Sequence, residues 1–196
     1  MKDTSAMTAN YYSAMGGHPP QSQLLTGRAI FTESYAVFPK GVMQDIVTSL
    51  LPHWEHTRAW IIARPLSGFA ETFSQYIMEV APGGGSLNPE PDAEAECVLF
   101  FVSGAATVTI AGKPHDLKTG SYAYIPSDTK WTLKNSGNEP TKFHWVRKAY
   151  EAAEGIAKPE SFVTSDAEVK PHPMPGTNGT WATSRFADPT DIRHDM

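Results

Sequence analysis

The sequence predicts an all-β fold, either a barrel or a sandwich built from short strands. Three observations lead to this prediction. Short runs rich in β-branched and aromatic residues recur through the middle of the chain, separated by Gly, Pro, Asn or Asp. Some runs alternate or are continuously apolar, and no segment sustains a helical period. The expected strands are residues 29–32, 35–38, 57–63, 72–80, 97–102, 106–110, 121–125, 131–134 and 142–146.

The pattern inside individual runs predicts how they are buried. In residues 72–80, Tyr76, Met78 and Val80 recur with a period of two, which is typical of a strand with one face in the core. Residues 98–102 are continuously apolar, as in a strand buried on both faces. The stretches between the runs predict turns at residues 81–85, 111–114 and 135–138.

Three regions of the chain differ in amino-acid composition. Residues 1–27 are polar and rich in Ser, Gly and Pro, so we expect an extended N-terminal arm. Residues 28–148 form the predicted barrel. Residues 149–196 contain many prolines, which predict a Pro-rich C-terminal linker or a strap packed on the barrel. The best candidate for a short helix is residues 149–157, directly after the barrel.

Composition limits the classes of partner. The net charge is −5 and the basic residues are scattered, so we expect no nucleic acid partner. Residues 1–12 lack the apolar run of a signal peptide, and no apolar stretch reaches the roughly 20 residues that span a bilayer. We therefore expect no membrane association. The single cysteine, Cys97, suits a reducing compartment, which together with the missing signal predicts a cytoplasmic protein.

Two segments carry a framework of regularly spaced residues. Gly85, Pro91, Ala93, Cys97 and Gly104 fall on the first frame, and Gly120, Pro126, Asp128, Trp131 and Asn135 fall on the second. These spacings resemble the two signatures of the cupins, which predicts a cupin-type β-barrel, or jelly roll, with an N-terminal arm and a C-terminal linker. The resemblance implies that Pro91, Ala93, Cys97 and Trp131 occupy the positions of the usual metal ligands.

The residue types at these four positions predict a barrel that binds no metal. Three His and one Glu usually provide the imidazole nitrogens and carboxylate of a cupin site. Pro91 and Ala93 cannot ligate, Trp131 offers only an N–H donor, and the thiolate of Cys97 alone is not a site. Trp131 is also bulky enough to fill the space of a metal and substrate. We therefore assign no catalytic, cofactor-binding or metal-binding residue, and expect this chain to bind no cofactor.

Other polar residues offer alternative sites. A shifted register aligns Glu90 and Asp92, with Glu94 and Glu96 nearby, as ligands of a hard cation; the favoured interpretation is a solvated acidic loop over residues 88–96.

Four histidines need separate interpretations. His53 and His56 would share a helix face and could bind zinc, although a surface loop is favoured. His144 could point into the barrel as an acid or base, or be an ordinary hydrogen-bonded histidine. His194, near the end of the sequence, is interpreted as packing between domains.

Longer strings identify a more specific resemblance, to the (S)-ureidoglycine aminohydrolase family of bicupins. It depends on residues 28–32, 39–43, 45–52, 57–60, 72–77, 82–86, 90–92, 181–186 and 191–196. The resemblance implies that residues 149–196 lead toward a second cupin that is absent from this chain. That second cupin would hold manganese through Glu, His, His and Gln, and would release ammonia from ureidoglycine to give ureidoglycolate in purine and allantoin breakdown.

Two hypotheses about function follow. In the first, the chain is the structural, metal-free N-terminal cupin of such an enzyme, inactive alone and part of a homo-oligomer, with the small molecule ureidoglycine as substrate of the complete protein. In the second, it is a stand-alone, non-catalytic cupin that binds a small ligand or a protein partner. The aromatic residues Trp131, Tyr122, Tyr124 and Phe101 would then line its pocket.

Overall fold

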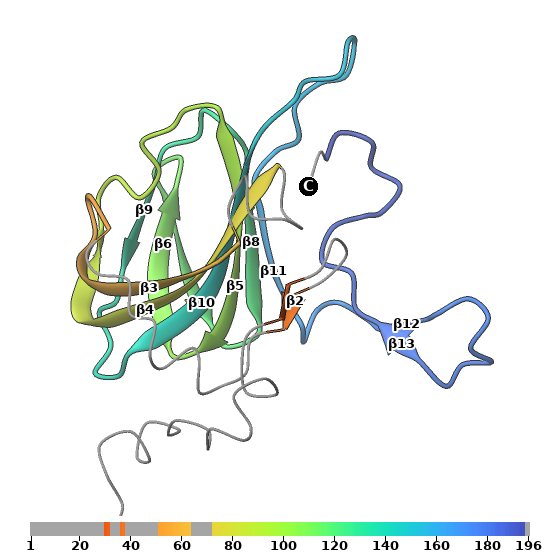
Figure 1. Cartoon of the computed structure of the whole chain (residues 1–196), viewed down its shortest axis with the longest axis horizontal. Coiled ribbons are helices and arrows are strands. Elements are labelled where there is room, and N and C mark those ends of the chain that lie inside the picture. Colours follow the sequence, from red (N-terminus) through yellow and green to blue (C-terminus); the bar gives the residue numbers. More distant parts are fainter. Residues whose placement is uncertain (1–29, 32–35, 38–50, 64–71, 195–196) are drawn as a thin grey trace, which may run out of the picture.

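A computed structural model describes residues 30–31, 36–37, 51–63 and 72–194 (Figure 1). All regular structure in these residues is β-strand, so the predicted all-β class is confirmed. The strands are β1 (Ile30–Phe31), β2 (Ala36–Val37), β3 (Glu55–Ala63), β4 (Phe73–Ser86), β5 (Ala95–Ser103), β6 (Ala105–Ile110), β7 (Lys113–Lys118), β8 (Ser121–Ile125), β9 (Trp131–Lys134), β10 (Thr141–Ala149), β11 (Phe162–Ser165), β12 (His172–Pro173) and β13 (Ala182–Thr183). The predicted N-terminal arm, residues 1–27, lies outside the described residues.

One sheet of nine strands curls into a nearly closed barrel. Its order is β11-β8-β5-β10-β4-β9-β6-β7, and β3 pairs with β4. The long strand β4 joins two parts of the barrel, because its first half pairs with β10 and β3 while Gly85 and Ser86 pair with β9. Figure 1 shows this strand curving under the barrel beside β3.

Two predicted turns have different outcomes. Ala111 and Gly112 both have positive φ and close the two-residue hairpin between β6 and β7, as predicted. The turn predicted at residues 81–85 is wrong, because β4 continues through them. A Cβ atom on Gly84 would lie 2.7 Å from the Glu55 carbonyl oxygen, and one on Gly85 would lie 2.0 Å from that of Leu133. These glycines therefore allow strands to approach closely rather than reverse the chain.

The helix predicted at residues 149–157 is also wrong. The segment leaves β10 in an irregular path and turns at Gly155, whose φ is +76°. The side chains of residues 151–155 are exposed. A short segment without an apolar face against the core lacks the packing that stabilises most protein helices.

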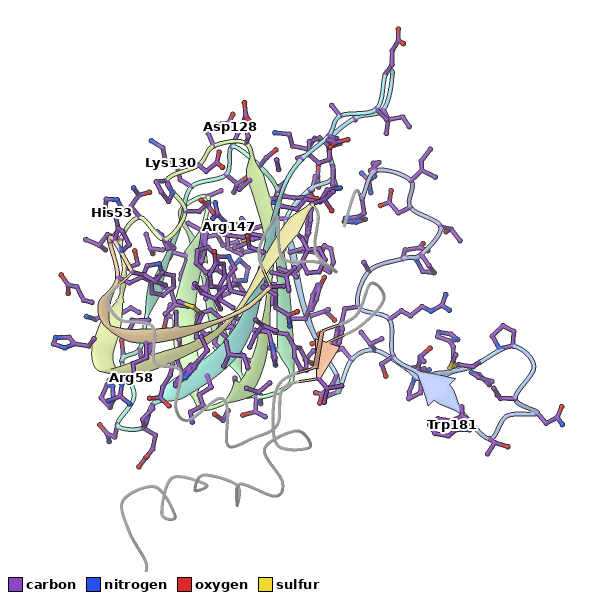
Figure 2. The ribbon with its side chains drawn as sticks, viewed as in Figure 1. His53, Arg58, Asp128, Lys130, Arg147 and Trp181 are labelled. Atoms are coloured by element: carbon purple, nitrogen blue, oxygen red, sulfur yellow. The ribbon has the colours of Figure 1, made fainter. Side chains whose placement is uncertain are left out.

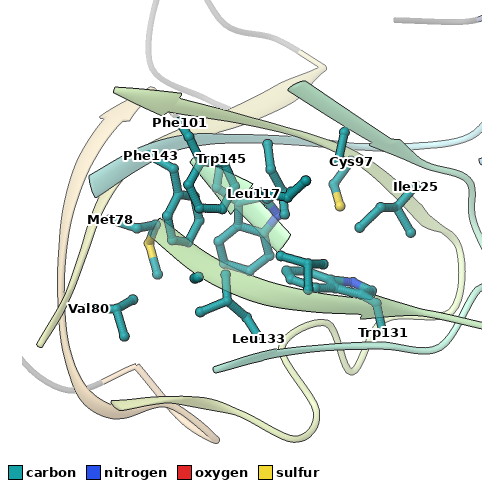
Figure 3. Packing of buried hydrophobic residues seen from close by; sticks show 14 of the residues in the cluster. Met78, Val80, Cys97, Phe101, Leu117, Ile125, Trp131, Leu133, Phe143 and Trp145 are labelled. Atoms are coloured by element: carbon teal, nitrogen blue, oxygen red, sulfur yellow. The ribbon is translucent and has the colours of Figure 1, made fainter. Parts of the chain in front are cut away.

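The barrel interior is filled by apolar side chains from its strands and from the segment before β3 (Figure 3). Alternate residues of β4, β5 and β10 supply Met78, Val80, Leu99, Phe101, Phe143 and Trp145. The ring centroids of Phe101 and Phe143 lie 5.1 Å apart. The period-two pattern at Met78 and Val80 is confirmed by their complete burial.

The C-terminal segment returns to the outer wall of the barrel. Strand β11 pairs with β8, the Phe186 ring stacks on Tyr122 with centroids 4.8 Å apart, and the His194 ring meets Tyr124 edge-on at 4.6 Å. His194 therefore packs against this barrel. Between these anchors, β12 and β13 form a hairpin that projects sideways from the barrel (Figure 1). The described residues include no helix long and apolar enough to cross a membrane.

Candidate functional site at the barrel mouth

The four positions where cupins carry metal ligands gather at one end of the barrel. Pro91, Ala93 and Trp131 line a groove of about 640 Å³. Cys97 and Trp131 lie at the same end of the interior in Figure 3, and Cys97 is fully buried. The groove also includes Leu87, Asn88, Glu90, Asp92, Ala95, Thr109, Gly112, Asp128, Thr129, Lys130 and Thr132.

Three indole rings fill the interior below this groove. The Trp131 centroid lies 6.3 Å from that of Trp54 and 6.1 Å from that of Trp145, and the Trp54 and Trp145 centroids are 5.8 Å apart. Trp54 comes from the segment before β3, where the sequence indicated only a surface loop. The floor of the groove is therefore aromatic and tightly packed.

The Cys97 thiol is unsuited to bind a soft cation. Burial raises the pKa of Cys97 from 9.0 to about 12, with the neighbouring Trp145 side chain acting in the opposite direction. The thiolate, which is the ligand form, is therefore scarce at neutral pH. Within the described ranges, no three His, Cys, Asp or Glu side chains are grouped so that they could hold a metal ion.

The favoured interpretation of residues 88–96 as a solvated acidic loop holds for Asp92 and Glu94, which are exposed, but is wrong for Glu90 and Glu96. The Glu90 side chain is only 5% exposed, and its Oε2 and Oε1 lie 2.5 and 2.6 Å from Nε and Nη2 of Arg147. Asp92 lies 3.8 Å from the same guanidinium. Burial raises the pKa of Glu90 above its ordinary value, and the Arg147 charge acts in the opposite direction. Both carboxylates therefore face the Arg147 guanidinium, and not the hard metal cation of the alternative interpretation.

Glu96 belongs to the opposite face of β5. Strand alternation turns Cys97 into the core and Glu96 toward the outer wall, where the Tyr124 hydroxyl donates a 2.5 Å hydrogen bond to Glu96 Oε2. Glu96 is completely buried, whereas Glu94 is exposed. The four carboxylates of this stretch are therefore not brought together.

The histidines take ordinary positions. His53 and His56 are exposed residues with positive φ, in a turn and at the start of β3, so they do not share a helix face. His144 faces outward between the inward-facing Phe143 and Trp145, and its Nδ1 lies 3.2 Å from Gln75 Nε2. Burial lowers the pKa of His144. The hydrogen-bonded interpretation of His144 is confirmed.

Sequence reasoning missed one wall of the groove. The Asp128 amide donates a 2.7 Å hydrogen bond to the Ala93 carbonyl, with Asp128 at φ 61°, and this bond holds the loop before β9 against the loop before β5. Lys130 follows on the same wall (Figure 2). The position of Asp128 on the second frame was the only signal for this wall.

Comparison with known proteins supports the fold. Residues 76–147 match a family model described as the cupin domain. A solved structure from Pseudomonas aeruginosa, of a protein whose name describes it as glyoxylate-induced, superposes with a TM-score of 0.80 at 52% identity, covering 91% of this chain and 65% of that one. The Ylba protein of E. coli superposes with a TM-score of 0.66 at 23% identity, covering 78% of this chain and 61% of the other. The predicted jelly-roll barrel is thereby confirmed.

One curated relative adds a distant similarity. A rice protein (Oryza sativa subsp. japonica) named as a probable (S)-ureidoglycine aminohydrolase is 25% identical over 181 residues, which cover 91% of this chain and 54% of the relative. This chain therefore spans about half the length of that relative, and less than two thirds of both solved proteins.

Proposed function

We propose that this chain, which carries a cupin domain, is the structural N-terminal cupin of an (S)-ureidoglycine aminohydrolase-like enzyme. In this proposal, a second cupin outside the chain performs the manganese-dependent release of ammonia from ureidoglycine. The barrel described above supports that second cupin and contributes to a homo-oligomer.

The packed interior at the barrel mouth is the observation that carries the proposal. A catalytic cupin keeps an open site surrounded by ligands, whereas Trp54, Trp131 and Trp145 pack together here. The similarity to the rice relative supports the assignment to this lineage, because it extends over 91% of this chain. The remaining length of that relative leaves room for a catalytic domain.

The residues that the structure describes in this barrel do not fit a manganese ion. Mn²⁺ prefers carboxylate, carbonyl and imidazole ligands, and the four ligand positions carry Pro91, Ala93, Cys97 and Trp131. The nearby carboxylates of Glu90 and Asp92 face Arg147 instead.

The pocket proposed for a stand-alone binding protein does not form. Of its four aromatic residues, only Trp131 reaches the groove. Phe101 is fully buried in the packed core, and Tyr122 and Tyr124 lie beneath the C-terminal segment on the outer wall. The four aromatic residues expected to line a ligand pocket of a stand-alone cupin therefore lie in three separate places: the groove, the core and the outer wall.

Two measurements on the purified chain test the proposal. Incubated with ureidoglycine and MnCl₂, the chain should release ammonia no faster than a protein-free control, and ammonia production above that rate would overturn the claim of a non-catalytic barrel. Metal analysis after dialysis should find fewer than about one manganese ion per ten chains. Near-stoichiometric manganese would contradict the inference.

The genomic reading frame tests the link to the enzyme. A frame that continues past the codon for Met196 into a second cupin with a Glu-x-His-x-x-x-His pattern would support it. A stop codon at that point would instead favour a stand-alone protein.

A further inference from the structure

The β12–β13 hairpin and the residues after it leave large apolar side chains uncovered. Trp181 is 68% exposed, Met174 is 41% exposed and Ile192 is 75% exposed. Figure 2 shows Trp181 on an arm that lies to the side of the barrel. Single exposed apolar residues are normal on a folded domain, but three large ones in one short segment indicate a surface that another part of a larger protein covers.

The same segment is attached to the barrel at two points. The Phe186 ring stacks on a tyrosine of β8 with centroids 4.8 Å apart, and the His194 ring meets the other tyrosine of that strand edge-on at 4.6 Å. Trp181 and Ile192 stay exposed although these neighbours in sequence are packed. The segment therefore has some side chains on this barrel and others that the barrel leaves open.

The hairpin is too small to be stable as a separate sheet. Strands β12 and β13 contain two residues each, and among the described strands they pair only with each other. An isolated pair of strands is marginally stable in water. The outer edge of β13 presents backbone groups that a further strand can pair with. The hairpin is therefore suited to be one part of a larger sheet.

The sequence around Trp181 repeats features of the sequence around Trp54. Each tryptophan directly precedes a strand, β13 in one case and β3 in the other. Each follows a turn that contains a residue with positive φ. The third and fourth residues after each tryptophan are a hydroxyl residue and an arginine, which are Thr57 and Arg58 in the first case and Ser184 and Arg185 in the second.

The two tryptophans differ in their surroundings. Trp54 is only 5% exposed, because its ring packs between Trp131 and Trp145 in the barrel interior. Trp181 holds the same position before a strand, but the described residues place no barrel interior around it. An indole that fills the core in one copy of a sequence feature and is exposed in the other indicates that the second copy needs a core of its own.

We propose that residues 172–192 begin the second cupin barrel, and that Trp181 fills the interior of that barrel as Trp54 fills this one. The inference rests on the proposed function, because it requires a second cupin. The rice relative has room for one, since the 181 matched residues cover 54% of its length. The second cupin then starts between β11 and β12, and the end of the Pro-rich segment supplies its first strand.

Iodide quenching of tryptophan fluorescence tests the proposal on the 196-residue chain and on the protein of the complete reading frame. Trp54, Trp131 and Trp145 are buried, so Trp181→Phe should remove most of the quenchable emission of the chain. In the longer protein, the same substitution should leave the quenchable emission unchanged, because Trp181 is buried there. A decrease like that in the chain would overturn this inference and leave the proposed function standing, whereas a stop codon directly after Met196 would overturn both.

Thermal unfolding of Trp181→Ala gives a second measurement. In the longer protein the unfolding midpoint should fall by at least about 5 °C, since the substitution removes a buried indole. In the 196-residue chain the midpoint should change by no more than about 1 °C, because the side chain is exposed. Leu87→Ala is the matched control and should leave both midpoints unchanged, since Leu87 is 89% exposed in the groove at the barrel mouth. An unchanged midpoint for Trp181→Ala in the longer protein would contradict the proposal.

Discussion

The Glu90 carboxylate and the Arg147 guanidinium form a two-point ion pair at the barrel mouth, with Oε2 2.5 Å from Nε and Oε1 2.6 Å from Nη2. The pair connects the loop before β5 to the end of β10. The Arg147 guanidinium also lies over the Trp145 ring, 5.6 Å from its centroid. From this arrangement we expect Arg147 to stabilise the ionised form of Glu90, which burial disfavours.

Replacing the arginine should destabilise the barrel in a pH-dependent way. Arg147→Met keeps much of the apolar stem over Trp145 but leaves Glu90 without its cation. Because Arg147 is 25% exposed, we expect a loss of about 2–3 kcal/mol in the free energy of unfolding at pH 7, below the usual cost of breaking a fully buried pair. Urea unfolding of both proteins measures this loss.

The sign of the pH dependence follows from the raised pKa of Glu90. A carboxyl whose folded-state pKa lies above its ordinary 4.5 contributes most stability below that value and loses it as pH rises through the folded pKa. Removing Arg147 raises this pKa further, so the deficit of Arg147→Met should be small near pH 4 and grow toward pH 7. In the background Glu90→Gln the growth should vanish. A deficit independent of pH would contradict the assignment.

The barrel was predictable because its signals are local. The alternation at Met78 and Val80 and the hairpin at Ala111 and Gly112 depend only on nearby residues. Strand β7 was missed because it is an edge strand with Pro114 and only Leu117 fully buried, so its sequence resembles a loop. The continuation of β4 through Gly84 was not predicted. The glycine is needed there because the Glu55 carbonyl, distant in sequence, approaches its backbone closely, and no local pattern reveals that contact.

The candidate site was predictable only at the positions that the spacing of the two cupin signatures identifies. That spacing placed Trp131 at the barrel mouth and showed that the usual metal-ligating residue types are absent from the ligand positions. It could not predict that Glu90 pairs with Arg147, 57 residues away, or that Trp54 enters the core from a segment with loop-like composition. Such contacts depend on how the strands are arranged in the closed sheet, and single-segment patterns contain no information about that arrangement.

The buried indole at the groove floor should be a major source of stability. Trp131 is 5% exposed and packs on two other indoles, so Trp131→Ala should lower the free energy of unfolding by about 3–5 kcal/mol. Trp181→Ala is the matched control, and because its side chain is exposed its effect should stay within about 0.5 kcal/mol under monomeric conditions. Guanidinium unfolding followed by far-ultraviolet circular dichroism measures both, and similar losses would argue against a packed floor.

The hydrogen bond between Tyr124 and Glu96 should stabilise the outer wall. Tyr124→Phe removes the hydroxyl that donates to Glu96 Oε2, and for the loss of this buried hydrogen bond to a carboxylate we expect a decrease of about 1–3 kcal/mol in the free energy of unfolding. Tyr122→Phe provides the comparison, since the Tyr122 hydroxyl makes no hydrogen bond to another described residue and its ring stacking on Phe186 is kept. Thermal unfolding at one pH suffices, and equal stability of the two variants would show that the short Tyr124 contact contributes little.

The single thiol should be unreactive while the barrel is folded. Burial raises the pKa of Cys97 to about 12, so at pH 8 the native protein should react with a disulfide reagent on the order of 100-fold more slowly than the unfolded chain, which exposes one thiol. A raised folded-state pKa also means that the neutral thiol's contribution to stability is complete below pH 9 and declines as pH rises toward 12. The stability of the wild type relative to Cys97→Val should therefore fall over this range. Rapid labelling of the native protein at pH 8 would show instead that the region around β5 opens readily, and that the wall beneath the groove is less tightly packed than the contacts of Trp131 and Trp145 imply.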